Sequence, residues 1–242
     1  MIELNNLTKS YAGGQKKAVD NLSWTINDGE IAGFIGPNGA GKSTTIKMMT
    51  GLVSPDSGSV ALNGFDITKD ALRAKQQFAY VSDTPDNFLR LKVIEYLNFI
   101  ADIYQVSEED RNSRITDMAE KFDLMEVLER PIMEFSHGMR QKVMIMGALV
   151  HNPSIWILDE PMVGLDPNAA FTLKELMREH AAAGNSVLFS THVLEVAEKL
   201  CDHIGLIVSG QMVFKGTMEE LKGRYPEGTS LETIFMEITK NA

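Results

Sequence analysis

Apolar residues in the first third of the chain form short runs that glycine-rich turns separate. The run at 31–35 is apolar throughout, which predicts a strand buried on both faces. Glycines and a helical pattern at 42–50 follow, and Gly51 is suited to ending that helix. Three dipeptides that favour hairpin turns lie between extended segments: Gly13-Gly14, Asp28-Gly29 and Asn63-Gly64. We therefore expect an antiparallel β region that leads into a strand, a glycine loop and a helix.

The middle of the chain, from 86 to 152, has the pattern of helices. Apolar residues recur at helical spacing near its start: Val93, Tyr96, Leu97 and Ile100. Ser107 stands before three acidic residues, which is typical of a helix start. A further helix is predicted at about 137–150, because Asn152-Pro153 is a sequence that ends helices. We interpret this block as a helical subdomain inserted in an α/β core.

The last third alternates between short apolar runs and helical patterns. Predicted strands span 155–158, 186–189, 204–208 and 211–214, and predicted helices span 168–183 and 193–200. Strands that alternate with helices favour a mostly parallel sheet covered on both faces. The whole chain, 1–242, is thus expected to form one α/β unit with an N-terminal antiparallel β subdomain, the helical insert and, at about 217–242, a C-terminal helical tail.

Composition narrows the classes of function. The 242 residues include 23 Lys and Arg against 33 Asp and Glu, a formal net charge of −10, so a nucleic-acid partner is not expected. The single cysteine, Cys201, excludes a disulfide framework and fits a reducing compartment. The longest clean apolar run, Val143 to Val150, is far shorter than the roughly 20 residues that a membrane span needs. The chain also starts without the pattern of a signal peptide, so we expect it to reach a membrane only through a partner.

A glycine-rich loop between the predicted strand at 31–35 and the helix at 42–50 carries the clearest chemical signal. It matches the pattern G-x-x-x-x-G-K-[ST] in full: Gly36, Pro37, Asn38, Gly39, Ala40, Gly41, Lys42 and Ser43. Glycines let the backbone wrap around phosphate, and amides at a helix N-terminus attract the anion. Lys42 is expected to reach the β- and γ-phosphates and Ser43 to ligate Mg²⁺, with Thr44 beside them. A plain glycine turn is the alternative; the flanking strand and helix favour a P-loop NTPase core.

A second signal is the acidic pair Asp159-Glu160, directly after the predicted strand at 155–158. Ligands of open α/β sheets bind at the carboxyl ends of the strands. Asp159 is therefore expected to hold Mg²⁺, through water, and Glu160 to orient the attacking water or accept its proton. Two acids after a strand commonly form only a solvated loop, but the phosphate-binding loop in the same chain favours the functional interpretation.

With these motifs in this order, the chain resembles the nucleotide-binding subunit of an ABC transporter over nearly its whole length. The segment from Phe135 to Gln141 stands where the family's signature, usually LSGGQ, belongs. The resemblance implies that four of its residues contact ATP held by the opposite subunit: Ser136, His137, Gly138 and Met139. An ordinary serine helix cap is the alternative, and the position of Ser136, 23 residues before Asp159, favours the signature.

Three further residues match the family's pattern. Asp166, in Gly164-Leu165-Asp166, is similar to the family's D-loop. His192 follows a late apolar strand and resembles the switch histidine, which implies hydrogen bonds to the γ-phosphate and the attacking water, so that Lys42, Glu160 and His192 would be the catalytic residues. Tyr11 resembles the aromatic residue that stacks on the nucleotide base.

Two positions depart from the common pattern. Asp83 ends the segment 78–83, which aligns with the family's Q-loop, where glutamine is usual. A carboxylate there can ligate Mg²⁺, but it adds negative charge near phosphate. Met139 replaces the signature's glutamine and offers no strong hydrogen bond. Exporter-like relatives carry similar departures, so an active ATPase is expected.

The resemblance implies a subunit that binds and hydrolyses ATP and couples the closure of two such chains to transport. Its partners would be transmembrane permease subunits and a second ATPase chain, identical or different, on the cytoplasmic face of the membrane. The segment 231–237 resembles a tail of exporter-type ATPases, which favours export. Two alternatives stay open: a soluble ABC-type ATPase of an assembly complex, such as iron–sulfur assembly, and a binding-only regulatory module, which Asp83 and Met139 motivate.

Overall fold

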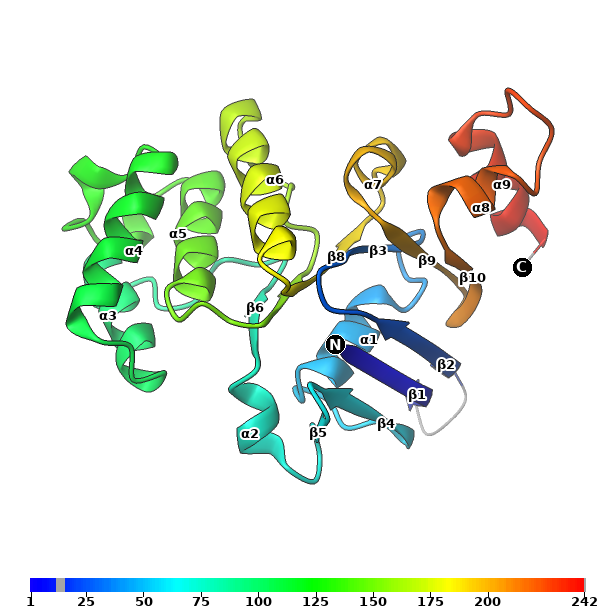
Figure 1. Cartoon of the computed structure of the whole chain (residues 1–242), viewed down its shortest axis with the longest axis horizontal. Helices are drawn as coiled ribbons and strands as arrows, with labels where there is room; N and C mark the ends of the chain where they lie inside the picture. The colour runs from blue at the N-terminus through cyan, green and yellow to red at the C-terminus, as the bar shows by residue number, and fades with distance from the viewer. Residues whose placement is uncertain (12–15, 242) are drawn as a thin grey trace.

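A six-stranded sheet runs through the centre of the computed structural model, which describes residues 1–11 and 16–241 (Figure 1). Its strand order is β10-β9-β3-β8-β7-β6, and all neighbours are parallel except β10 and β9. The strands are β3 (Ile31–Ile35), β6 (Phe78–Val81), β7 (Ile155–Leu158), β8 (Ser186–Thr191), β9 (His203–Val208) and β10 (Gln211–Gly216). The prediction of a mostly parallel sheet is confirmed.

Apolar side chains of this central sheet alternate between two cores. In β7, Ile155 and Ile157 belong to one core, and Trp156 and Leu158 belong to the other. The first core contains α1 (Lys42–Met49) and the second sheet, and the other contains the helices of the insert. Because both faces are covered, the strand is apolar at every position, as a buried parallel strand should be.

The second sheet is antiparallel throughout, in the order β2-β1-β4-β5. Its strands are β1 (Ile2–Tyr11), β2 (Lys16–Ile26), β4 (Ser57–Leu62) and β5 (Phe65–Asp66). Asn63-Gly64 forms the predicted hairpin turn, with φ of 49° and 80°. The hairpin predicted at Asp28-Gly29 is wrong, because β3 is apolar on both faces and joins the central sheet instead of pairing with β2. Gly13-Gly14 lies outside the described residues.

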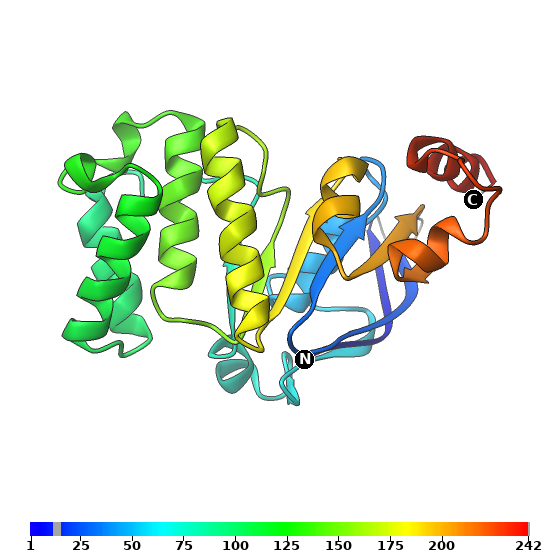
Figure 2. The same cartoon turned by 45° about the horizontal axis from the view of Figure 1, so that its top comes forward.

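Four long helices lie side by side at one end of the molecule (Figures 1 and 2). They are α3 (Val93–Ile103), α4 (Glu108–Lys121), α5 (His137–Leu149) and α6 (Pro167–Ala182). Short 3-10 turns, η1 (Met125–Val127) and η2 (Ile132–Glu134), join α4 to α5. Ser107 caps α4 as predicted, since its hydroxyl accepts the amide of Asp110 at 3.1 Å. These helices surround the core that carries Trp156.

The C-terminal segment lies at the opposite end (Figure 1). Its helices are α8 (Met218–Lys222) and α9 (Leu231–Asn241), next to α7 (Leu194–Leu200); the short α2 (Ala71–Lys75) lies near β5. Leu231 and Ile234 of α9 are buried in a third core with Phe214 of β10, whereas Met236 is 55% exposed. None of the helices in the described part of the chain has the length and apolar character needed to cross a bilayer.

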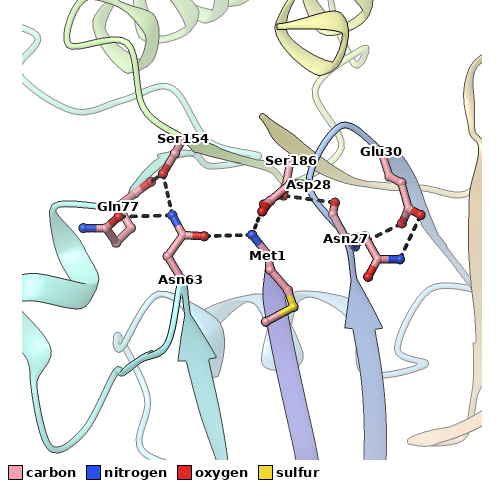
Figure 3. A network of polar contacts seen from close by, with 8 residues as sticks. All are labelled: Met1, Asn27, Asp28, Glu30, Asn63, Gln77, Ser154 and Ser186. Atoms are coloured by element: carbon pink, nitrogen blue, oxygen red, sulfur yellow. Dashed lines mark hydrogen bonds and ion pairs between the residues drawn. The ribbon is translucent and has the colours of Figure 1, made fainter. Parts of the chain in front are cut away.

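A network of polar contacts joins the two sheets near the N-terminus (Figure 3). The amino group of Met1 donates to Asn63 Oδ1 at 2.7 Å and pairs with the carboxylate of Asp28. Asn63 Nδ2 donates to Ser154 Oγ at 2.8 Å, and Ser186 Oγ donates to Asp28 Oδ1 at 3.1 Å. Asn63 lies in a turn of the antiparallel sheet, whereas Ser154 and Ser186 lie at the starts of β7 and β8. The contacts therefore fix the position of the antiparallel sheet relative to the central sheet.

The single cysteine, Cys201, packs against the central sheet next to Gly33 of β3. A Cβ on Gly33 would come within 2.5 Å of Cys201 Sγ, so a larger residue there would require the cysteine side chain to shift. Burial raises the pKa of the Cys201 thiol well above its usual range.

Candidate functional site

The glycine-rich loop lies between β3 and α1, as predicted. Gly41, at the N-terminus of α1, has a φ of 114°, and a Cβ there would lie 2.4 Å from the carbonyl oxygen of Ala18. A Cβ on Gly36 would lie 2.4 Å from the carbonyl oxygen of Ile207. Both glycines are required by the close approach of the loop to β2 and β9.

A cavity of about 660 Å³ opens over this loop. The loop and the start of α1 contribute Pro37, Asn38, Gly39, Gly41, Lys42, Ser43 and Thr44 to its lining. Tyr11, Asp83 and Glu160 line it as well, so the structure brings together predicted residues from four separate segments. Gly36 and Ala40 lie behind the lining, and Ala40 is buried.

Asp159 lies at the end of β7 and is only 1% exposed. Ser190 of β8 donates its hydroxyl to Asp159 Oδ1 at 2.5 Å and accepts the amide of Glu160 at 2.9 Å. Burial raises the pKa of the Asp159 carboxyl, against the lowering by hydrogen bonds from Ser190 and Ser43; the carboxylates of Asp83 and Glu160 raise it further. Burial among like charges makes this carboxylate suited to a cation.

Glu160 is the meeting point of the predicted catalytic residues. Its Oε1 lies 3.5 Å from Lys42 Nζ, and its Oε2 lies 3.0 Å from His192 Nδ1. Lys42 also donates to the carbonyl oxygen of Gly36 at 2.7 Å. Glu160 has a φ of 47°, a left-handed conformation that is unusual for a residue other than glycine and is typical of functional sites.

Two predicted residues flank the cavity from other elements. Tyr11 ends β1 and is 45% exposed, as a side chain that presents its ring to a ligand should be. Asp83 follows β6 and lies close enough to Asp159 to raise the pKa of that carboxyl. Tyr11 therefore comes from the antiparallel sheet, whereas Asp83 follows a strand of the central sheet.

The signature residues are not part of this cavity. None of the residues 136–139 is among its described lining. Ser136 caps α5 by accepting a hydrogen bond from the amide of Met139 at 3.3 Å, so the helix cap named as the alternative is present. Within one chain, the structure does not bring the signature to the loop at 36–43.

The signature and the segment 164–166 contact each other closely. A Cβ on Gly138 would lie 2.3 Å from the carbonyl oxygen of Gly164, and a Cβ on Gly164 would lie 2.4 Å from the ring of His137. Lys142 of α5 lies 2.9 Å from Asp166 Oδ2, and Asp166 caps α6 by accepting the amide of Ala169. These contacts fix the two segments relative to each other.

Sequence reasoning missed several residues of the site. Ser190 contacts both acidic residues, although no motif in the sequence marks it. Four further residues that line the cavity were not predicted: Lys17, Ala18, Ser209 and Gly210. They come from β2 and the β9–β10 turn, and no local motif marks them.

The donor set around Asp159 fits Mg²⁺. Asp159 Oδ2 is buried and has no hydrogen-bond partner among the described residues. The Ser43 hydroxyl and the Asp83 carboxylate lie nearby, and Mg²⁺ prefers oxygen ligands of these kinds. In the described ranges no cluster of three or more acidic, imidazole or thiol side chains forms a metal cage. Such a sparse set suits Mg²⁺, which usually takes one or two carboxylates together with substrate phosphates and waters.

Comparisons with known proteins give one family. The family model described as ABC transporter matches residues 19–163, which include the phosphate loop, the signature and the acidic pair. The ABC-type transporter ATP-binding protein EcsA of Bacillus subtilis is 37% identical over 241 residues, covering 99% of this chain and 97% of that protein. The linearmycin resistance ATP-binding protein LnrL of the same species is 35% identical, covering 99% of this chain and 76% of that protein.

A solved structure, described as that of an ATP-binding subunit of an ABC transporter, has the same fold. Its TM-score is 0.94 at 35% identity, and the match covers 99% of each chain. The likeness therefore includes the C-terminal helices α8 and α9 as well as the segment that the family model matches.

Proposed function

This chain belongs to the ABC transporter family as an ATP-binding subunit, and we propose that it hydrolyses MgATP and couples hydrolysis to export through separate membrane subunits. The observation that carries the catalytic part is the contact of Glu160 with both Lys42 and His192 at the rim of a phosphate-loop cavity. A carboxylate between a lysine and a histidine, next to a triphosphate site, is placed to act on a water that attacks the γ-phosphate.

We assign a separate role in ATP binding or hydrolysis to each group of residues in the cavity. We assign the triphosphate to the amides of the loop at 36–43 and to the ammonium group of Lys42. Glu160 accepts the proton of the attacking water, and His192, bonded to Glu160 Oε2, orients that carboxylate and contacts the γ-phosphate. Tyr11 stacks on the base, an interaction worth roughly 1–3 kcal/mol.

Asp159, Ser43 and Asp83 would hold Mg²⁺. When bound, the ion neutralises charge that develops on the phosphate oxygens. Ser190 serves this set by fixing Asp159 Oδ1, which leaves Oδ2 free to face a cation.

A complete site needs a second chain. Ser136, His137, Gly138 and Met139 lie outside the cavity, with Ser136 and His137 exposed at the N-terminus of the 13-residue helix α5. We propose that this helix end faces the ATP of an opposite ATPase chain, identical or different. The contacts of Gly138 with Gly164 and of Lys142 with Asp166 hold the D-loop segment at the same surface.

The membrane subunit is proposed to bind next to Asp83 on the helical insert. Phe88 and Phe99 pack against each other there, with ring centroids 5.6 Å apart, yet they are 46% and 43% exposed. Paired exposed aromatics are typical of protein-binding surfaces. Export is supported by the acidic Q-loop position, by Met139 and by a relative that is named for linearmycin resistance.

The test is a pull-down of the tagged Glu160→Gln chain from its native membranes, with ATP and mild detergent. We expect a polytopic membrane protein in stoichiometric amount, identified by mass spectrometry, and it would supply the substrate-selecting component. Recovery of soluble partners alone would contradict the transport role and favour an assembly ATPase.

Two charge substitutions sharpen this experiment. Phe99→Asp is expected to lose the membrane partner, because it places a charge in the exposed aromatic pair. Met236→Asp is the matched control, since Met236 is also exposed but lies on α9 at the other end of the molecule (Figure 1). Equal recovery with both variants would exclude the surface at Phe88 and Phe99.

A further inference from the structure

The β9–β10 turn, Ser209-Gly210, is hydrogen-bonded to the phosphate loop and lines the same cavity. The amide of Gly210 donates to the carbonyl oxygen of Ala40 at 2.8 Å. The carbonyl oxygen of Gly210 accepts the amide of Asp20 in β2, also at 2.8 Å. One residue thus bonds to the loop of the central sheet and to a strand of the antiparallel sheet.

The backbone of this turn is shaped for close approach. Ser209 and Gly210 have φ of 48° and 84°, both left-handed. A Cβ on Gly210 would lie 2.9 Å from the carbonyl oxygen of Ala18 and 3.1 Å from its carbonyl carbon. Because these contacts are to backbone, a side chain at 210 could be accepted only if β2 moved.

The same strand also confines the phosphate loop. The carbonyl oxygen of Ala18 lies against Gly41 as well as Gly210, and both glycines would clash with it if they carried a Cβ. Ala18, Gly41, Ser209 and Gly210 all line the cavity. A shift of the turn would therefore change the position of both the loop and the part of β2 that lines the cavity.

Peptide planarity connects this contact to the phosphates. The carbonyl group of Ala40 and the amide group of Gly41 belong to one planar trans peptide, in which C=O and N–H point in opposite directions. The hydrogen bond from Gly210 holds the C=O, so it also sets the direction of the Gly41 N–H. Amide groups that are fixed before the ligand arrives bind an anion more tightly than amide groups that must be ordered on binding.

We infer that the Ser209-Gly210 turn is a positioning element of the ATP site, which sets the Ala40–Gly41 peptide for the triphosphate. This inference rests on the proposed function, because it assumes that the cavity binds ATP.

The test compares Gly210→Ala with Gly184→Ala in the full-length chain. Gly184 has nearly the same φ, 85°, but a Cβ there would meet nothing within 4 Å. Both variants carry the strain of a left-handed alanine, and only Gly210→Ala disturbs the contact with β2 and the loop. We expect about tenfold weaker binding of MgATP by Gly210→Ala in calorimetry, which is the loss of about one hydrogen bond, and no change for Gly184→Ala.

Competition with AMP separates positioning from a general loss of structure. AMP lacks the β- and γ-phosphates, so its affinity is expected to change far less than that of ATP in Gly210→Ala. If AMP and ATP weakened equally, or if Gly210→Ala bound ATP as tightly as Gly184→Ala, the turn would have no positioning role. If the unsubstituted chain did not bind ATP, the proposed function would fail instead.

Hydrogen exchange on the unsubstituted chain keeps the inference testable if Gly210→Ala does not fold. MgATP is expected to slow exchange of the Gly210 amide, since the triphosphate stabilises the peptide to which that amide is bonded. Exchange of this amide at the same rate with and without ATP would overturn the inference.

Discussion

Replacing Ser190 with alanine is expected to destabilise the chain and impair turnover together. The hydroxyl is fully buried and uses both its donor and its acceptor, on Asp159 Oδ1 and on the Glu160 amide. The bond to a carboxylate is worth about 1.5–3 kcal/mol and the neutral bond about 0.5–1.5 kcal/mol. Ser190→Ala should therefore lower the free energy of unfolding by about 2–4.5 kcal/mol, or the melting temperature by roughly 4–18 °C.

A second serine of the same strand is the matched control. Ser186 is equally buried, and its hydroxyl contacts the carbonyl oxygen of Asn27 and the carboxylate of Asp28, each at 3.1 Å (Figure 3). Ser186→Ala should also lose stability in urea unfolding, but at the end of β8 that is away from the cavity. Turnover of MgATP below the melting temperature should fall only in Ser190→Ala. Equal loss of turnover in both variants, or unchanged stability of Ser190→Ala, would refute the reasoning.

The remaining predictions concern the base, the signature contact, a buried histidine and the metal. Glu160→Gln should lower ATP turnover about 100-fold or more while keeping the ATP-induced rise in melting temperature, and unchanged turnover would exclude Glu160 as the base. Gly138→Ala places a Cβ 2.3 Å from the Gly164 carbonyl oxygen and should lower the free energy of unfolding by about 1–3 kcal/mol in urea; no loss would mean that the two segments separate easily. Burial lowers the pKa of His180 from 6.5 to about 4, so below pH 6.5 the unfolded chain binds a proton that the folded chain does not. Loss of stability between pH 7 and pH 5 should therefore be smaller in His180→Leu by on the order of 2 kcal/mol, while the part due to His151, whose pKa burial also lowers to about 4, remains; an undiminished loss in that variant would assign it to other groups. Chelation of Mg²⁺ with EDTA should abolish turnover and leave measurable ATP binding in calorimetry, whereas turnover without metal would exclude the proposed metal ligands.

Local sequence patterns predicted the elements well where the chain marks both ends of a segment. The strands at 31–35 and 155–158 were predicted to the residue, because polar residues or glycine bound each apolar run at both ends. The turn at Asp28-Gly29 was wrongly predicted to be a hairpin, because its local sequence fits a hairpin as well as it fits the observed connection between two sheets. Which sheet the next strand joins depends on what covers its two faces, and that is decided by distant segments.

In the candidate site, too, residues in local motifs were predicted, and residues placed by distant segments were not. The loop at 36–43 and the acidic pair were found because their chemistry is contiguous in sequence. Ser190 is separated from Asp159 by 31 residues, and a serine within an apolar strand has no local mark of function. Gly210 is similar: its sequence predicts only a turn, and its role depends on the backbone of Ala40 and Asp20, which the sequence does not place beside it.

The raised pKa of the partly buried Cys201 makes the chain well suited to labelling experiments. It is the single cysteine of 242 residues, and its raised pKa keeps the sulfur as a thiol, which reacts far more slowly than a thiolate. A maleimide fluorophore or spin label should therefore spare it and react with a cysteine introduced at an exposed position. One such position on each of two ATPase chains would let their closure around ATP be followed as a change in the distance between probes, without first removing any native residue.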